Sequence, residues 1–289
     1  MLSDYVTLLR PAQWVKNAFV LAPLVFSHRL FRAESLASAA VAFVAFSVGS
    51  SAAYVFNDVL DRERDREHPL KSLRPIACGR VTIASAAALA TVLAALSLVF
   101  ASALGGRFVI VLALFLVVQV LYSTGLKAVI VADVAAIALL FVLRAAGGVI
   151  AIEARMSAWL FLCTFLLAMF LGLGKRRHEL ALLKDEAGVH REVLGRYSAT
   201  LLDRLIVAVA ATTIVVYTIY TLWPSVEAKL GTERLYLTVP FVAFGLIRYL
   251  FLIYQRDEGG SPTDLLLADV PLQLGIAGWI VTVFLLLYL

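Results

Sequence analysis

The chain has 289 residues, of which 62% are hydrophobic and 16% charged, and its mean hydropathy is +0.93. Soluble domains carry about 25% charged residues, so this composition excludes a soluble globular protein and indicates an integral membrane protein. Loops at the surface of an anionic membrane account for the net charge of +5, and the charge therefore predicts membrane lipids as partners and no nucleic acid.

Apolar segments long enough to cross a bilayer, which takes about 20 helical residues, follow one another along the chain. Six are free of charge, two contain charged residues, and the first is short and contains Pro23. The expected spans are residues 17–28, 35–57, 81–106, 108–126, 128–152, 156–174, 205–226, 235–255 and 270–289. The sequence therefore predicts an all-α membrane protein with nine transmembrane helices in a single domain, residues 1–289.

Lysine and arginine are distributed unequally between the two sides of this arrangement. With nine spans, 17 of these cations fall on the side of the N-terminus and 6 on the opposite side. Short cytoplasmic loops carry the excess of positive charge, so we expect a multi-pass protein of the plasma membrane with its N-terminus inside the cell and its C-terminus outside.

An acidic stretch, residues 57–65 (NDVLDRERD), follows the second expected span. If the helix continues through it, Asp58, Asp61 and Asp65 share one face, with Asn57 beside them. Their oxygens are the ligands that Mg²⁺ prefers, and Mg²⁺ commonly completes its coordination with substrate phosphates. The stretch therefore predicts a magnesium site for a diphosphate on the cytoplasmic side. The alternative is a solvated helix end in which neighbouring arginines neutralise the aspartates.

Two basic segments lie on the same predicted side as the acidic stretch. Lys16 and Asn17 flank the first span, where binding of a substrate and simple anchoring by Trp14 at the membrane surface are equally good interpretations. Arg74 and Pro75 lie in the loop behind the aspartates, which proline prevents from continuing as a helix. We interpret Arg74 as a substrate-binding residue.

Lys127 and Asp133 lie near the start of the fifth span, at the same predicted membrane surface. An acidic residue at this depth is costly unless it is paired or hydrated, which favours a functional role for Asp133. Arg144 is three helical turns further on, too far for a direct ion pair with Asp133, and we expect it to bond to another helix.

Lys175, Arg176 and Arg177 follow the sixth span. A basic cluster here is explained equally well by the orientation of the protein in the membrane and by binding of phosphate, for which arginine offers a suitable fork of donors.

The acidic stretch and Arg74-Pro75 together resemble the first signature of the UbiA-type intramembrane prenyltransferases, NDxxDxxxD followed by RP. This resemblance extends over the whole chain. It implies nine transmembrane helices around a central cavity, a lateral opening for a polyprenyl chain, and Mg²⁺ held by Asn57, Asp58, Asp61 and Asp65, with the three aspartates as the catalytic residues.

Within this family, four stretches resemble the branch that uses phosphoribosyl pyrophosphate and decaprenyl phosphate in the synthesis of cell-wall arabinan precursors. They are RPAQWVKN with APLVFSHRL, YSTGLK with Asp133, GKRRHEL, and GSPTDLLLADVPLQ. The second stretch adds Tyr122 and Ser123 to the residues expected to bind substrate.

One departure from the aromatic prenyltransferases favours this branch. Those enzymes resemble one another in a second acidic motif after the sixth helix, where this chain has GKRRHEL. A basic cluster opposite one acidic motif suits a donor that carries an additional phosphate.

We therefore expect transfer of 5-phosphoribosyl from phosphoribosyl pyrophosphate to a polyprenyl phosphate, with release of pyrophosphate. The alternatives are a prenyltransferase that joins a prenyl diphosphate to an aromatic or quinone precursor, and a transporter of polyprenyl lipids. The length of the prenyl chain and the oligomeric state, a homo-oligomer included, stay open.

Overall fold

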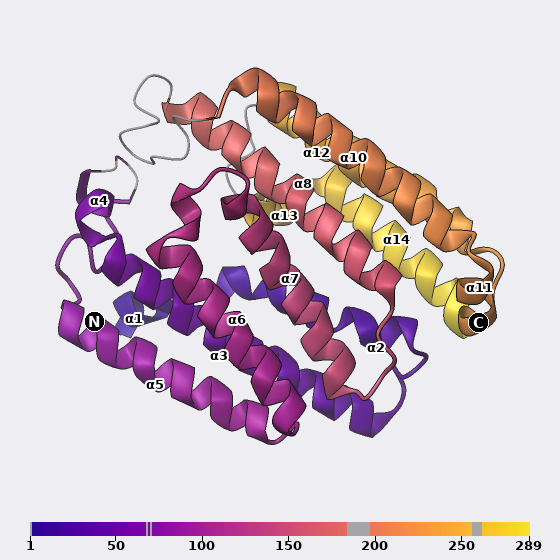
Figure 1. Cartoon of the computed structure of the whole chain (residues 1–289), viewed down its shortest axis with the longest axis horizontal. Coiled ribbons are helices and arrows are strands. Elements are labelled where there is room, and N and C mark those ends of the chain that lie inside the picture. The colour runs from indigo at the N-terminus through magenta and orange to yellow at the C-terminus, as the bar shows by residue number, and fades with distance from the viewer. Residues whose placement is uncertain (1, 68, 70, 184–196, 256–261) are drawn as a thin grey trace. The chain divides into compact units, whose positions relative to one another are not determined.

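A computed structural model describes residues 2–67, 69, 71–183, 197–255 and 262–289. Within these ranges the secondary structure is entirely helical, without strands, which confirms the predicted all-α class. The chain forms two compact units (Figure 1). Unit 1 comprises residues 1–24, 32–136 and 140–155, and unit 2 comprises residues 25–31, 137–139 and 156–289. That residues 1–289 act as one catalytic domain stays a prediction.

Eight helices in the described ranges are long and apolar enough to cross a membrane. They are Ala33–Leu60, Ile83–Ser102, Gly106–Thr124, Ala132–Ala151, Ala158–Ala181, Ala199–Thr221, Leu235–Gln255 and Val270–Tyr288. The predicted number of nine is therefore not confirmed. The segment that the sequence assigned to the first span, residues 17–28, contributes only the end of a 3₁₀ helix and the five-residue helix α2 (Ala22–Phe26).

Unit 1 is built around α3, the longest of its helices. Its elements are α1 (Leu2–Leu9), the 3₁₀ helix η1 (Pro11–Val20), α3 (Ala33–Leu60), α4 (Arg62–Glu67), α5 (Ile83–Ser102), α6 (Gly106–Thr124), the 3₁₀ helix η2 (Leu126–Ala128) and α7 (Ala132–Ala151). α3 and α5 are both rich in alanine and serine, and these small side chains allow the two helices to lie closely side by side (Figure 1).

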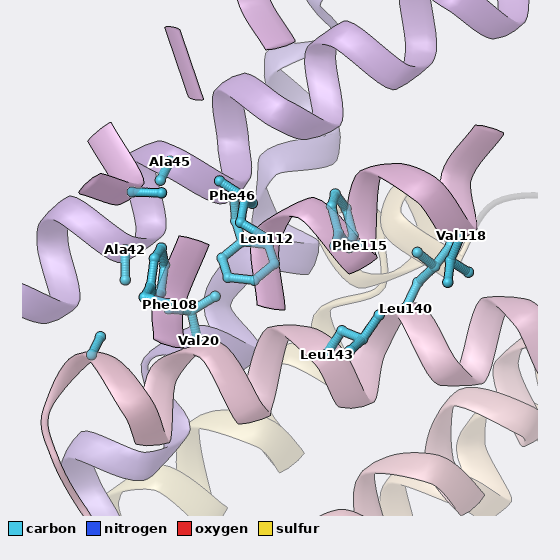
Figure 2. Close-up of a cluster of buried hydrophobic side chains, with 12 residues drawn as sticks. Val20, Ala42, Ala45, Phe46, Phe108, Leu112, Phe115, Val118, Leu140 and Leu143 are labelled. Carbon is cyan, nitrogen blue, oxygen red and sulfur yellow. The ribbon is translucent and has the colours of Figure 1, made fainter. Parts of the chain in front are cut away.

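A cluster of buried apolar side chains, most of them from α3, α6 and α7, lies in unit 1 and also includes Val20 of η1 and Ala101 of α5 (Figure 2). The ring of Phe46 packs edge to face against Phe108 and Phe115, at centroid distances of 5.8 and 5.2 Å. Gly147 provides the space for this ring, because a Cβ at that position would collide with the Phe46 side chain. Such aromatic pairs add about 1 kcal/mol each beyond the burial of their surface.

The N-terminal segment, residues 9–20, runs antiparallel to α3 from its acidic end toward its middle. Arg10 contacts Asp58, Trp14 contacts Ser51, and Asn17 contacts Ser47. A 3₁₀ helix rises about 2.0 Å per residue, so the ten residues of η1 extend roughly 20 Å. This explains how a segment too short for a transmembrane α-helix follows α3 over much of its length.

Unit 2 contains α8 (Ala158–Leu183), α10 (Ala199–Thr221), α11 (Pro224–Leu230), η5 (Leu235–Thr238), α12 (Val239–Gln255), α13 (Pro262–Ala268) and α14 (Val270–Tyr288). α8 packs on α10, and α12 packs on α14. α10 begins six residues before the predicted span at 205, because the Ser198 side chain caps the helix by accepting a hydrogen bond from the Leu201 amide. The prediction from hydropathy started only at residue 205, because Asp203 and Arg204 follow the first turn of the helix.

Candidate active site

The acidic stretch lies where α3 ends. The α-helix stops at Leu60, and Asp61 has φ −89° and ψ 5°, after which α4 begins at Arg62. The backbone bonds from Asp61 N to Asn57 O (2.9 Å) and from Asp65 N to Asp61 O (2.8 Å) continue across the break. An uninterrupted α-helix through the stretch is therefore wrong, because α3 ends at Leu60 and α4 begins at Arg62.

Asp58 and Asp65 are both buried, at 3% and 4% exposure, and one arginine joins them. The Nη1 atom of Arg74 donates to Asp58 Oδ1 at 3.0 Å and to Asp65 Oδ2 at 2.6 Å. A second guanidinium, that of Arg10, donates to the same Asp58 oxygen at 2.5 Å. Two cations from distant parts of the sequence therefore neutralise these two carboxylates.

Asp61 is more accessible and has a different cation. Its side chain is 21% exposed, and Lys127 Nζ lies 2.5 Å from Oδ1. Asn57 Nδ2 donates to its other oxygen at 2.9 Å. Each of the three aspartates thus contacts a cation, and the cations come from the N-terminal segment, the loop after α4, and η2.

Local packing fixes the loop that carries Arg74. Ile76 is 1% exposed and belongs to an apolar cluster with Leu8 and Val55. Arg66 Nε donates to the Ala77 carbonyl at 2.9 Å, which ties the loop to α4. Because Pro75 restricts the backbone of the preceding residue, Arg74 is held beside the carboxylates on a rigid support.

The surroundings of Asp65 alter its acidity. Burial raises the pKa of the Asp65 carboxyl above its usual value, and the charge of Arg74 opposes this shift. Arg74 therefore favours the ionised form of Asp65, which is the form that binds a metal ion or its complex with a phosphate-bearing ligand.

The donor chemistry of the acidic stretch fits Mg²⁺, since three carboxylates and a carboxamide supply hard oxygen atoms. The described residues contain no group of three acidic, histidine or cysteine side chains arranged around a common metal position. The carboxylates instead contact Arg10, Arg74 and Lys127. For a metal to bind here, these cations must therefore leave the carboxylates. An anionic ligand would provide them with new partners.

The other predicted residues of unit 1 occupy different positions. Asn17 is completely buried and bonds to Ser47 and Arg144, away from the aspartates. Lys16 and Tyr122 are partly exposed, while Ser123 and Asp133 are buried, Asp133 completely. Their binding of substrate stays a prediction.

The predicted basic cluster belongs to unit 2, at the end of α8. Arg176 is completely buried and forms an ion pair with Glu179, one turn further along the helix. Arg177 Nε lies 2.7 Å from Asp203 Oδ1 on α10. Lys175 is the most accessible of the three, with a side chain 40% exposed. Their binding of phosphate stays a prediction.

Arg10 is the residue that the sequence reasoning missed. Its backbone is left-handed, with φ 51°, which is unusual for a residue other than glycine, and it directly precedes Pro11. Its guanidinium also stacks over the Tyr54 ring at 5.2 Å. The dipeptide Arg10-Pro11 repeats Arg74-Pro75, and this repetition was the available signal.

These observations define the class of protein: a multi-pass helical membrane protein with a charged site at the end of one long helix. The comparisons with known proteins identify its relatives. Residues 18–265 match the model of the UbiA prenyltransferase family. The chain is 35% identical to decaprenyl-phosphate phosphoribosyltransferase of Mycobacterium tuberculosis, over 98% of this chain and 94% of the relative. It is 34% identical to the protein of that name from Corynebacterium glutamicum, over 97% and 86%.

The fold is also similar to that of a solved structure. A UbiA homolog from Archaeoglobus fulgidus, solved with GPP and Mg²⁺, superposes with a TM-score of 0.75 at 21% identity, over 99% of this chain and all of the other. The chain belongs to the UbiA prenyltransferase family.

Proposed function

We propose that this protein transfers the 5-phosphoribosyl group of phosphoribosyl pyrophosphate to a polyprenyl phosphate and releases pyrophosphate. The near-full-length similarity to relatives named decaprenyl-phosphate phosphoribosyltransferase is the observation that carries this proposal. Decaprenyl phosphate is the acceptor that those names indicate.

The contacts of the acidic stretch support a diphosphate as the ligand. Arg10, Arg74 and Lys127 neutralise the aspartates, and all three side chains are partly exposed, between 16% and 27%. A diphosphate that arrives with its metal would take these cations as its own counter-charges, while the carboxylates turn to the metal. The total charge of the site then changes little on binding.

Mg²⁺ bound by Asn57, Asp58, Asp61 and Asp65 would supply stabilisation of the negative charge on the departing pyrophosphate. In the reaction an oxygen of the acceptor phosphate attacks ribose C1, and the bond from C1 to the pyrophosphate oxygen breaks. The acceptor phosphate is already ionised near pH 7, so the protein needs no general base. Arg10, Arg74 and Lys127 hold the donor, and they neutralise the oxygen that leaves.

The basic cluster of unit 2, residues 175–177, supplies the reason to prefer a phosphoribosyl donor over a prenyl diphosphate. The resemblance described above implies that the aromatic enzymes of the family carry acidic residues there, for further metal ions. Arginine and lysine instead suit the additional 5-phosphate of the donor or the phosphate of the acceptor. We also propose Lys16, Asn17, Tyr122, Ser123 and Asp133 as members of the substrate-binding region, on the resemblance described above.

We propose the plasma membrane as the location, with the acidic stretch facing the cytoplasm. The distribution of lysine and arginine supports this orientation, and a cytoplasmic site agrees with a water-soluble donor.

The test uses purified protein in detergent with donor labelled in the ribose, polyprenyl phosphate and Mg²⁺. We expect the label to enter the lipid fraction, and excess EDTA to prevent this. A parallel reaction offers a prenyl diphosphate with an aromatic acceptor. Label in the aromatic product alone would replace the proposal with the aromatic prenyltransferase, and absence of both products would remove the enzymatic interpretation.

A further inference from the structure

Arg144 of α7 is a buried cation that the proposed reaction does not use. It is 3% exposed, and its guanidinium lies between the rings of Phe115 and Phe141, at 4.7 and 5.2 Å from their centres. No carboxylate of the described residues forms an ion pair with it. Burial of an arginine without a counter-ion is costly, so a purely structural position would be filled better by an apolar side chain.

The hydrogen bonds of Arg144 lead to the N-terminal segment. Its Nε donates to Asn17 Oδ1 at 2.7 Å, its Nη1 to the Leu140 carbonyl at 3.0 Å, and its Nη2 to Ser50 Oγ at 3.4 Å. Asn17 Nδ2 in turn donates to Ser47 Oγ at 3.0 Å. Arg144 therefore fastens Asn17 to α3 and α7 at once.

The N-terminal segment depends on such tertiary bonds. Runs of 3₁₀ helix longer than about four residues are uncommon, because their hydrogen bonds are poorer than those of an α-helix, yet η1 has ten residues. Ser51 provides a second attachment, since its Oγ donates to the Leu9 carbonyl at 2.8 Å and accepts from Trp14 Nε1 at 3.0 Å. A third is the close approach of the Val20 carbonyl to Gly148.

The segment ends at the acidic stretch. Arg10 follows Leu9 directly, has the left-handed backbone described above, and places its guanidinium on Asp58. An arginine with four flexible side-chain torsions on a strained backbone keeps this position only if the backbone before and after it is fixed.

We infer that Arg144 is a positioning residue for the acidic site, which acts through Asn17 and the N-terminal segment to hold Arg10 at Asp58. It does not touch the reacting groups. This inference rests on the proposed function for its consequence in catalysis, but the fixation of the segment is independent of any reaction.

The first experiment measures hydrogen exchange of Arg144→Gln without ligands. We expect faster exchange of the backbone amides in residues 10–20 and unchanged exchange in unit 2. The matched control is Arg248→Gln. Arg248 lies within the span of α12, and it pairs with Asp269 of unit 2 through Nε (3.1 Å) and Nη2 (2.7 Å). This control should leave residues 10–20 unchanged.

The second experiment measures kinetics of the same variants. We expect Arg144→Gln to raise the donor KM about tenfold, as for the loss of a charged hydrogen bond, with little change of kcat or of the acceptor KM. Arg10→Gln should raise the donor KM by a similar factor, and the double variant should be no worse than the worse single variant. Arg248→Gln should lower thermal stability without changing the donor KM.

If Arg144→Gln does not fold, Arg144→Met takes its place, since it removes the buried charge while Asn17 keeps Ser47 and Ser50 as hydrogen-bond partners. Unchanged exchange in residues 10–20, or an unchanged donor KM in an active protein, would overturn the inference. Wild-type protein that transfers no ribose would instead refute the proposed function, and hydrogen exchange alone would then decide on the role of Arg144.

Discussion

Asp58, Asp61 and Asp65 have different surroundings, so their substitutions should differ in their effects on stability. Asp61 is the most accessible and packs little, so Asp61→Asn should reduce transfer by roughly a hundredfold or more while leaving the unfolding temperature nearly unchanged. Glu63→Gln is the matched control, because Glu63 is 72% exposed and contacts only arginines. Activity of Asp61→Asn near that of the control at saturating Mg²⁺ would contradict the site.

Asp58 should behave differently from Asp61. Its carboxylate is buried between Arg10 and Arg74, so Asp58→Asn leaves Arg10 without its counter-charge and leaves Arg74 with Asp65 alone. We expect loss of transfer together with a decrease of about 2 to 4 kcal/mol in the free energy of unfolding. Thermal or denaturant unfolding in detergent measures this, and a stability equal to that of Asp61→Asn would show that the ion pairs of Asp58 contribute nothing to folding.

The basic residues of unit 2 provide the test of the sugar donor. If Arg177 binds a donor phosphate, Arg177→Gln should raise the donor KM roughly tenfold to a hundredfold and change the acceptor KM much less. Arg204→Gln is the control, since Arg204 is an exposed neighbour outside the cluster. Arg176→Gln carries an additional cost in stability, because it removes the partner of Glu179 inside the unit. Equal donor KM values for Arg177→Gln and the control would favour a prenyl diphosphate as donor.

At the scale of elements, the contact of η1 with α7 predicts the effect of replacing Gly148. A Cβ on Gly148 would collide with the Val20 carbonyl, which belongs to the backbone and is unable to move as a side chain does. Gly148→Ala should therefore destabilise the protein by about 1 to 3 kcal/mol.

Gly245 of α12 is the matched control for Gly148. A Cβ there would meet only Leu272 Cδ1 at 4.0 Å, and alanine is the better helix former, so Gly245→Ala should be neutral or stabilising by up to about 1 kcal/mol. Comparison of the two unfolding temperatures in one detergent tests the packing of η1 on α7. A neutral Gly148→Ala would mean that η1 does not lie against α7.

The elements also show which features the sequence could predict. Long apolar segments predicted all eight of the described spans, because hydropathy and helix length depend on local composition. The 3₁₀ conformation of η1 was not predictable in this way, since it depends on side-chain bonds of Trp14 and Asn17 to serines more than 30 residues away. The same limit applies to Arg10, whose role becomes visible only when η1 is placed beside α3.

In the acidic stretch, too, only some of the features could be predicted from the sequence. The spacing of Asp58, Asp61 and Asp65 predicted one site, and Arg74-Pro75 predicted its cation. Lys127 and Arg10 lie 66 and 48 residues from the aspartates that they contact, and no local pattern predicts such pairs. The acidic residues could thus be predicted from the sequence, whereas their cationic partners Arg10 and Lys127 depend on the fold.

At the scale of the whole molecule, the described spans predict the sides on which the loops lie. Seven of the eight long apolar helices follow the acidic stretch, and an odd number of crossings places the loop with Cys78 and the C-terminus on opposite sides of the membrane. The excess of cations predicts that the Cys78 side faces the cytoplasm. Cys78 is exposed, whereas Cys163 lies within α8, so Cys78 is a suitable natural probe.

The measurement is labelling of Cys78 by a membrane-impermeant maleimide in vesicles of either orientation. Cys78 should react only where the cytoplasmic face is outward, and a cysteine added after Leu289 in a Cys78→Ser protein should react only in vesicles of the opposite orientation. A reporter near Lys184, which lies outside the described residues, should agree with Cys78. Labelling of both cysteines from the same face would mean that the number of crossings between them is even, and labelling of Cys78 from the external face would reverse the orientation that a cytoplasmic donor requires.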